Sequence, residues 1–94
     1  MSDQPSADAQ ARIAELRQQI DDVDARIVEL LNERARFSLE IRGLKPQAHL
    51  GLYDPKREEE IFARLAEQNR GPLYDENLRE IYEAILHVMK EMRG

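Results

Sequence analysis

The chain has 94 residues, of which 41% are hydrophobic and 35% charged, with only four glycines and four prolines. This composition is typical of one small helical domain with a thin core, for which partner chains are expected. A formal net charge of -5 and the absence of cysteine exclude a nucleic-acid surface, which needs a basic face, and exclude disulfides and thiolate chemistry.

The N-terminal stretch "MSDQPSADAQA" has no signal-peptide core, and no apolar run approaches the roughly 18 residues of a membrane span. We therefore expect a cytoplasmic protein. Residues 1–8 are polar and contain proline and alanine, and we interpret them as a flexible leader. Residues 9–94 are expected to form a single domain.

One long helix of roughly 35 residues is predicted from about Ala9, and neither glycine nor proline interrupts it until Gly43 and Pro46. Apolar residues recur along it in steps of three and four, and we call them the apolar seam: Ile13, Leu16, Ile20, Val23, Ile27, Leu30, Phe37, Ile41 and Leu44. A helix of roughly 35 residues extends about 50 Å. Two short helices cannot cover such a seam, so the pattern predicts a homodimer in which a second copy covers it.

The loop "KPQAHLGLY" precedes a second predicted helix. Asp54 as N-cap and Pro55 at the first helical position mark its start, and it runs to about Asn69, where "NRGP" ends it. A third helix is predicted from Asp75. One face of this helix carries the apolar residues Leu78, Ile81, Tyr82, Ile85, Met89 and Met92. The predicted fold class is all-α, with one very long helix and two shorter ones.

Three basic residues of the long helix are candidates for a site. Arg34 occupies the seam position after Leu30, where an unpaired buried guanidinium would be costly, so it is expected to pair, to set the register or to bind a ligand. Arg17 lies at the edge of the seam, and Lys45 follows the helix end, where the dipole favours a cation. The other arginines of this helix are assigned to solvent: Arg12, Arg26, Arg36 and Arg42.

The second helix carries an inward acid. Three apolar residues define its buried direction: Ile61, Phe62 and Leu65. Glu58 lies near the centre of that sector. Asp54 projects near it, and Arg57 lies at the edge. The remaining charged residues are assigned to solvent: Lys56, Glu59, Glu60 and Arg64.

An inward acid beside two or three inward arginines fits either a structural salt-bridge cluster or a pocket for a small anion that also has a hydroxyl. Periodicity leaves both interpretations open. His49 and His87 are lone histidines, and no metal site is expected at them. The sequence has no catalytic-triad pattern, phosphate loop or cofactor fingerprint, and no cofactor is expected.

Three motifs resemble the all-α chorismate mutase family: L-R-x-x-I-D at residues 16–21, D-x-x-I-x-x-L-L-x-x-R ending at Arg34, and Y-D-P-x-R-E at residues 53–58. The likeness covers residues 13–92. It implies an intertwined homodimer of three-helix chains in which the long helices pair and each active site takes one arginine from the partner. The implied reaction converts chorismate into prephenate in phenylalanine and tyrosine biosynthesis, without metal or cofactor.

The resemblance also implies roles for individual residues. Arg34, with Arg17 of the partner subunit, would bind the two carboxylates of chorismate. Lys45 would contact a carboxylate and the ether oxygen, and Arg57 would help to set the charge of the pocket and position the substrate. Glu58, with the backbone or side chain of Asp54, would take the ring hydroxyl.

The third helix departs from the family pattern. The family commonly has a serine that binds a carboxylate and, four residues later, a glutamine that donates to the ether oxygen; these positions fall on Met89 and Arg93. Methionine cannot donate a hydrogen bond, whereas Arg93 is a cation that would stabilise the developing charge.

Two other functions stay open on the sequence alone. A lyase that cleaves isochorismate to pyruvate and salicylate uses a similar scaffold, and a catalytically weak domain would serve in dimerisation or regulation. Residues 9–94 are expected to form a single chorismate mutase domain, which either stands alone or was excised from a larger fusion enzyme.

Overall fold

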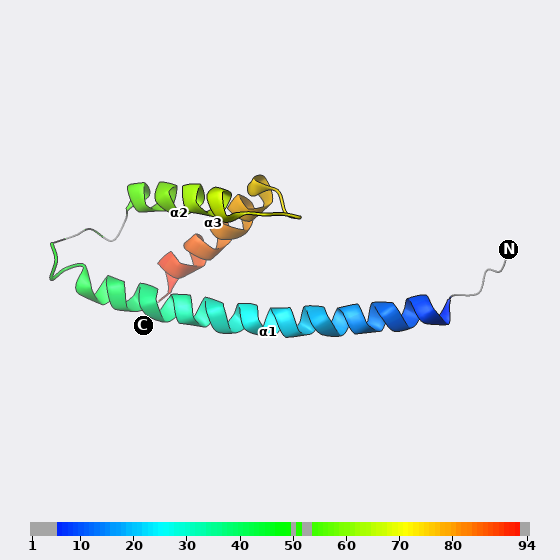
Figure 1. Cartoon of the computed structure of the whole chain (residues 1–94). Helices are drawn as coiled ribbons and strands as arrows, with labels where there is room; N and C mark the ends of the chain where they lie inside the picture. Colours follow the sequence, from blue (N-terminus) through cyan, green and yellow to red (C-terminus); the bar gives the residue numbers. More distant parts are fainter. Residues whose placement is uncertain (1–5, 50, 52–53, 93–94) are drawn as a thin grey trace. The chain divides into compact units, whose positions relative to one another are not determined.

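A computed structural model describes residues 6–49, 51 and 54–92, and within these ranges the chain contains three α-helices and no strand (Figure 1). The helices are α1 (Ala7–Leu44), α2 (Pro55–Gln68) and α3 (Asp75–Glu91). The predicted all-α class, with one very long helix and two shorter ones, is confirmed. The chain forms two parts, one ending at Arg34 and the other beginning at Ala35, and α1 contributes to both.

The start of α1 lies two residues before the expected Ala9. Its first residue is Ala7, because the Ser6 hydroxyl accepts a hydrogen bond from the Ala9 N–H at 3.2 Å and so satisfies a free donor of the first turn. Asp8 is helical as well, although we assigned it to the leader. The helix ends at Leu44, between Gly43 and Pro46, where the sequence predicted an interruption.

The apolar seam is exposed in a single chain. In the part that ends at Arg34, the exposed fractions of the seam residues run from 40% at Leu16 to 62% at Leu30. In the other part, Phe37, Ile41 and Leu44 are each more than half exposed. Large apolar side chains in a row of this kind are unusual on a monomer surface and mark interaction sites.

The start of α2 follows the predicted capping pattern. The Asp54 side chain accepts a hydrogen bond from the Arg57 N–H at 3.1 Å, and Pro55 is the first helical residue. At the start of α3, the Asn77 side chain accepts from the Tyr74 N–H at 3.0 Å, so a side chain again satisfies a backbone donor at a helix start.

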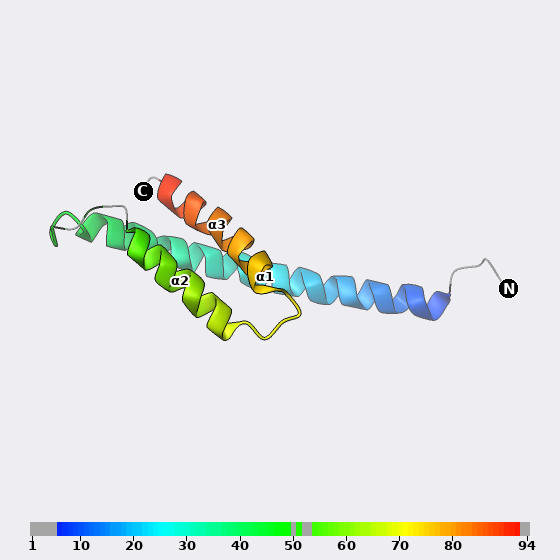
Figure 2. The ribbon, with the colours of Figure 1, turned by 90° about the horizontal axis from the view of Figure 1, so that it is seen from above.

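Residues 69–74 connect α2 to α3, which pack against each other (Figure 2). The Asn69 side chain organises this connection: its amide nitrogen donates to the Leu73 carbonyl and to the Asp75 carboxylate, both at 2.8 Å, and its oxygen accepts from the Gly71 N–H. Gly71 has a φ of 75°, which glycine adopts without steric cost. The predicted end of the second helix at "NRGP" is confirmed.

The core beside α2 and α3 is thin. Among the described residues, only Leu86 and Met89 are buried, each 8% exposed. Ile81, which we expected on the apolar face of α3, is 47% exposed. The buried sector of α3 is centred on Leu86 and Met89, and Ile81 is rotated away from it. A core of this size is weak support for a lone chain.

No helix in the described ranges combines the length and the apolar character that crossing a bilayer requires.

Candidate functional site

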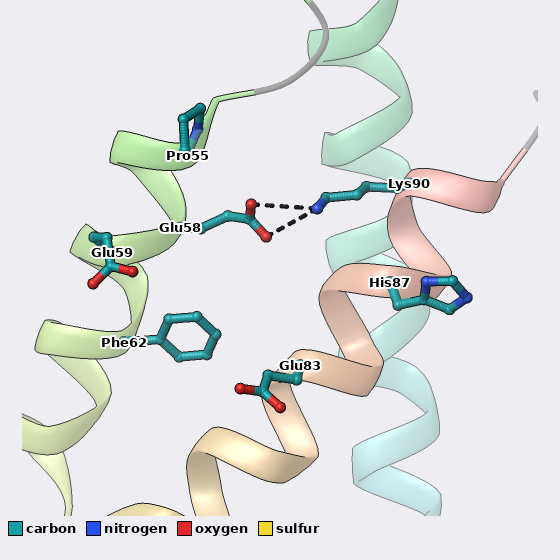
Figure 3. A pocket seen from close by; sticks show the side chains of 7 residues that line it. All are labelled: Pro55, Glu58, Glu59, Phe62, Glu83, His87 and Lys90. Atoms are coloured by element: carbon teal, nitrogen blue, oxygen red, sulfur yellow. Dashed lines mark hydrogen bonds and ion pairs between the residues drawn. The ribbon is translucent and has the colours of Figure 1, made fainter.

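Glu58 of α2 and Lys90 of α3 form an ion pair between the two helices (Figure 3). The Lys90 ammonium lies 3.0 Å from Glu58 Oε1 and 3.3 Å from Oε2. The Glu58 side chain is only 22% exposed, whereas that of Lys90 is 51% exposed. The acid that helical phase directed inward is thus partly buried and matched by a cation.

Local sequence fixes the direction of Glu58. The Asp54 cap and Pro55 set the residue at which α2 starts, and the Glu58 N–H makes an early helical hydrogen bond to the Asp54 carbonyl at 3.2 Å. The start of a helix determines the angle at which every later side chain projects. The "DPxxE" spacing therefore places this carboxylate on the side of α2 that meets α3.

A cleft of about 280 Å³ opens at this ion pair (Figure 3). It is lined by Pro55, Glu58, Glu59, Phe62, Glu83, His87 and Lys90. Three carboxylates against one ammonium leave an excess of two negative charges when the histidine is neutral. By itself, this negatively charged lining repels a dicarboxylate. Of the residues that line the cleft, only Glu58 was predicted to belong to the substrate pocket.

Arg42, which we assigned to solvent, instead binds the C-terminal end of α3. Its guanidinium donates to three backbone carbonyls: those of Met89 at 3.1 Å, of Lys90 at 2.7 Å and of Met92. The last carbonyls of a helix have no partner within the helix and carry the negative end of its dipole. A guanidinium with several donors suits this position, and the assignment to solvent was wrong.

The predicted arginines of the seam lie in the part of the chain that ends at Arg34. Arg34 is partly buried and Arg17 is exposed. Lys45 directly follows α1, is partly buried, and donates its backbone N–H to the Ile41 carbonyl at 2.9 Å.

The remaining predicted site residues have different environments. Asp54 is exposed in the single chain and caps α2, beside the free N–H groups of the first turn. Arg57 is half-exposed, and its guanidinium lies 3.7 Å from Glu60. Met89 is buried. Arg93 lies outside the described residues.

Sequence reasoning missed Lys90 and Arg42. Lys90 follows the buried Met89 directly, so its position beside an apolar face was readable, but its pairing with Glu58 depends on how α2 packs against α3. No feature of the sequence indicated the contacts of Arg42, because its partners are backbone carbonyls of another helix.

In the described part of the chain, no group of three or more histidine, aspartate or glutamate side chains is placed to hold a metal ion. The glutamates and the histidine that line the cleft do not converge on one point. The polar lining of the cleft consists of three carboxylates, one imidazole and one ammonium group.

The comparisons with family models, with curated proteins and with solved structures all give the same family. The family model for chorismate mutase type II matches residues 16–93. A bifunctional chorismate mutase/prephenate dehydratase of Aquifex aeolicus is 35% identical over 83 residues, which are 85% of this chain and 21% of that protein. The chain thus spans about a fifth of the length of the bifunctional relatives that it matches.

Two solved structures are similar over most of their length. A chorismate mutase from Thermus thermophilus has 41% sequence identity and a TM-score of 0.83, covering 86% of this chain and 92% of that one. A chorismate mutase from Helicobacter pylori, solved in complex with prephenate, has 30% identity and a TM-score of 0.79, covering 86% and 88%.

Proposed function

The chain belongs to the type II chorismate mutase family, and we propose that it converts chorismate into prephenate, a step in phenylalanine and tyrosine biosynthesis. The observation that carries this proposal is the likeness to the Thermus thermophilus chorismate mutase, at 41% identity over 86% of this chain. Prephenate in the Helicobacter pylori structure further supports the assignment of the product. A cytoplasmic location stays a prediction of the sequence.

The reaction is a Claisen rearrangement within one molecule. The ether C–O bond breaks while a C–C bond forms, so the protein needs no nucleophile and no proton transfer. It contributes by holding a compact conformer of the substrate and by placing positive charge where negative charge develops on the ether oxygen. Arginine suits the first task, because its planar fork binds a carboxylate through two hydrogen bonds and fixes its angle.

We assign the carboxylates of chorismate to Arg34 and to Arg17 of the partner subunit, with Lys45 at one carboxylate and the ether oxygen. The partly buried position of Arg34 in an otherwise apolar seam supports its part in this assignment. Arg57 adds positive charge to the pocket. It is half-exposed and only loosely paired with Glu60, so a substrate can compete for it.

Glu58 receives the ring hydroxyl in this proposal. Its carboxylate is 22% exposed and therefore reachable, and two oxygens leave it free to accept from a hydroxyl as well as from Lys90. Asp54 contributes as the cap that orients Glu58 and through its backbone. Its side-chain oxygen already accepts from the Arg57 N–H.

The end of α3 differs from the family pattern implied by the sequence resemblance. Met89 is buried, so the position where a serine is usual contributes packing and offers no donor. Arg93 then supplies the positive charge at the ether oxygen in place of the usual glutamine. A cation is effective there, since the developing charge is negative.

We further propose that two chains intertwine through the apolar seam and build two sites together. Seam residues are 40–62% exposed in the single chain, and the buried core of the described residues is limited to Leu86 and Met89. A second copy would remove the seam from water and would bring in Arg17 of the partner subunit. Self-complementary pairing of this kind is the commonest form of oligomer.

The activity is tested by incubating the purified chain with chorismate. The readouts are the loss of chorismate ultraviolet absorbance and the identification of prephenate as the product. Parallel incubation with isochorismate, assayed for pyruvate and salicylate, distinguishes the lyase. Turnover of chorismate is expected. Turnover of isochorismate alone would identify a lyase, and turnover of neither compound by folded dimer would leave a dimerisation or regulatory module.

A further inference from the structure

Lys90 takes part in contacts with both of the other helices. Its backbone carbonyl accepts a hydrogen bond from Arg42 of α1 at 2.7 Å, and its side-chain ammonium lies 3.0 Å from Glu58 of α2. All three residues belong to the same part of the chain. Arg42, Lys90 and Glu58 therefore form a series of polar contacts that links α1, α3 and α2, and we call it the Arg42–Lys90–Glu58 series.

The position of the Lys90 ammonium depends on the backbone that carries it. Lysine has a long flexible side chain with high conformational entropy, and this one is 51% exposed, so packing alone does not fix it. Lys90 also lies one residue before the end of α3 at Glu91, and last turns of helices tend to fray.

Arg42 opposes fraying at this helix end. Its guanidinium binds the carbonyls of Met89, Lys90 and Met92, so it contacts the turn that carries Lys90 on both sides of that residue. Hydrogen bonds from a charged donor are stronger than those between neutral groups. Loss of these bonds releases the last turn of α3 and, with it, the Lys90 ammonium from Glu58.

We propose that Arg42 is a positioning residue for Glu58, acting through the last turn of α3 and the Lys90 ammonium. The inference deepens the proposed function and rests on it for its catalytic meaning, because Glu58 there receives the substrate hydroxyl. Arg42 itself touches neither substrate nor reacting atoms in this proposal.

Steady-state kinetics with chorismate test the effect on the reaction. Arg42→Ala is expected to lower kcat/KM about tenfold, whereas Arg36→Ala, which removes an exposed arginine of the same helix, should stay within about twofold of the unmodified chain. Arg42→Lys keeps a cation at the helix end but cannot span three carbonyls, so a loss of about threefold is expected. Circular dichroism identifies variants that remain folded.

A double-mutant cycle tests whether Arg42 acts through Lys90. In a Lys90→Met background the ammonium is already gone, so Arg42→Ala should lower kcat/KM by less than about twofold further. If the two losses multiply instead, Arg42 acts by another route and the proposal is wrong. If Arg42→Ala does not fold, Arg42→Lys takes its place in the cycle with the same two outcomes.

The Glu58 carboxylate can be followed without any turnover. Its side-chain ¹³C resonance should move in the same direction in Arg42→Ala as in Lys90→Met, by less in Arg42→Lys and not in Arg36→Ala. If the unmodified chain does not convert chorismate, only the proposed function is refuted. The positioning role can still be tested, because the resonance reports on Glu58 without turnover. A resonance that moves in Lys90→Met but stays unchanged in both Arg42 variants would overturn the positioning role.

Discussion

The Lys90 ammonium lies 3.0 Å from Oε1 of Glu58 and joins α3 to α2 at the mouth of a cleft. The pair combines a carboxylate that is mostly shielded from water with a lysine that is half-exposed. Because the lysine is half-exposed, the pair contributes modestly to stability, and its contacts with both carboxylate oxygens orient the carboxylate.

Lys90→Met tests these two effects separately. The free energy of unfolding should fall by only about 0.5–1 kcal/mol, because water reaches the half-exposed lysine and screens the pair. By contrast, kcat/KM for chorismate should fall about tenfold, because Glu58 loses its orientation. Urea unfolding at fixed chain concentration and steady-state kinetics measure the two quantities.

Lys56→Met is the matched control for this prediction. Lys56 is exposed on α2, and its replacement removes the same charge and adds the same side chain. Equal loss of activity in the Lys56 and Lys90 variants would show that net charge, and not the contact with Glu58, is responsible.

Asp54→Ala is expected to lower the free energy of unfolding by about 1 kcal/mol, because the Arg57 N–H loses its acceptor. Asp54→Asn keeps a side-chain oxygen at the cap and should cost no more than a few tenths of a kcal/mol. Thermal unfolding of the two variants measures the difference. The same loss in both would mean that the negative charge matters and the cap does not.

Substitutions at Arg93 test whether its guanidinium takes the place of the glutamine that the family commonly has at this position. If it stabilises charge on the ether oxygen, Arg93→Gln should retain kcat within about threefold, and Arg93→Ala should lower kcat about tenfold or more. Rates at saturating chorismate measure this. Equal kcat in all three forms would show that Arg93 takes no part in the reaction.

The sequence predicted what depends on local pattern. Asp54 followed by Pro55 is typical of a helix start, and Gly71 can adopt the left-handed backbone of the connection that follows α2. The seam of α1 was readable because a period of three and four persists over many turns. These signals need only neighbouring residues, and the helix boundaries that they predicted lie within two residues of those observed.

Contacts between helices were less readable. Helical phase gave the inward direction of Glu58, yet the identity of its partner, Lys90, depends on how α3 lies against α2. Arg42 lies off the seam of its own helix, which predicted solvent, and its partners are carbonyl groups that carry no sequence signature. Side-chain phase describes one helix at a time, so partners supplied by another helix need the structure.

Ile20→Glu tests the seam as a dimer interface. Ile20 is 57% exposed in the single chain, and a carboxylate there would be buried without a partner if a second copy covers it. Sedimentation should show twice the mass of the chain for the unmodified protein and a monomer for Ile20→Glu.

Gln18→Glu introduces the same charge on the opposite side of α1 and should remain dimeric. Dissociation of both variants to the same extent would point to a general effect of charge. An unmodified chain that sediments as a monomer would refute the interface and the shared site together.

In the proposed dimer, two chains together build each chorismate site, with Arg34 from one subunit and Arg17 from the other. Arg17→Ala and Arg34→Ala should each lower kcat/KM about a hundredfold or more as separate proteins. The most direct measurement is the activity recovered when the two variants are unfolded, mixed in equal amounts and refolded together.

Random pairing makes half of the dimers mixed, and each mixed dimer then contains one site with both substitutions and one with neither. Recovery of about a quarter of the unmodified activity is therefore expected. If both arginines came from one chain, every site in a mixed dimer would carry one substitution. Activity that stays at the level of the separate variants, with mixed dimers shown to be present, would contradict the shared site.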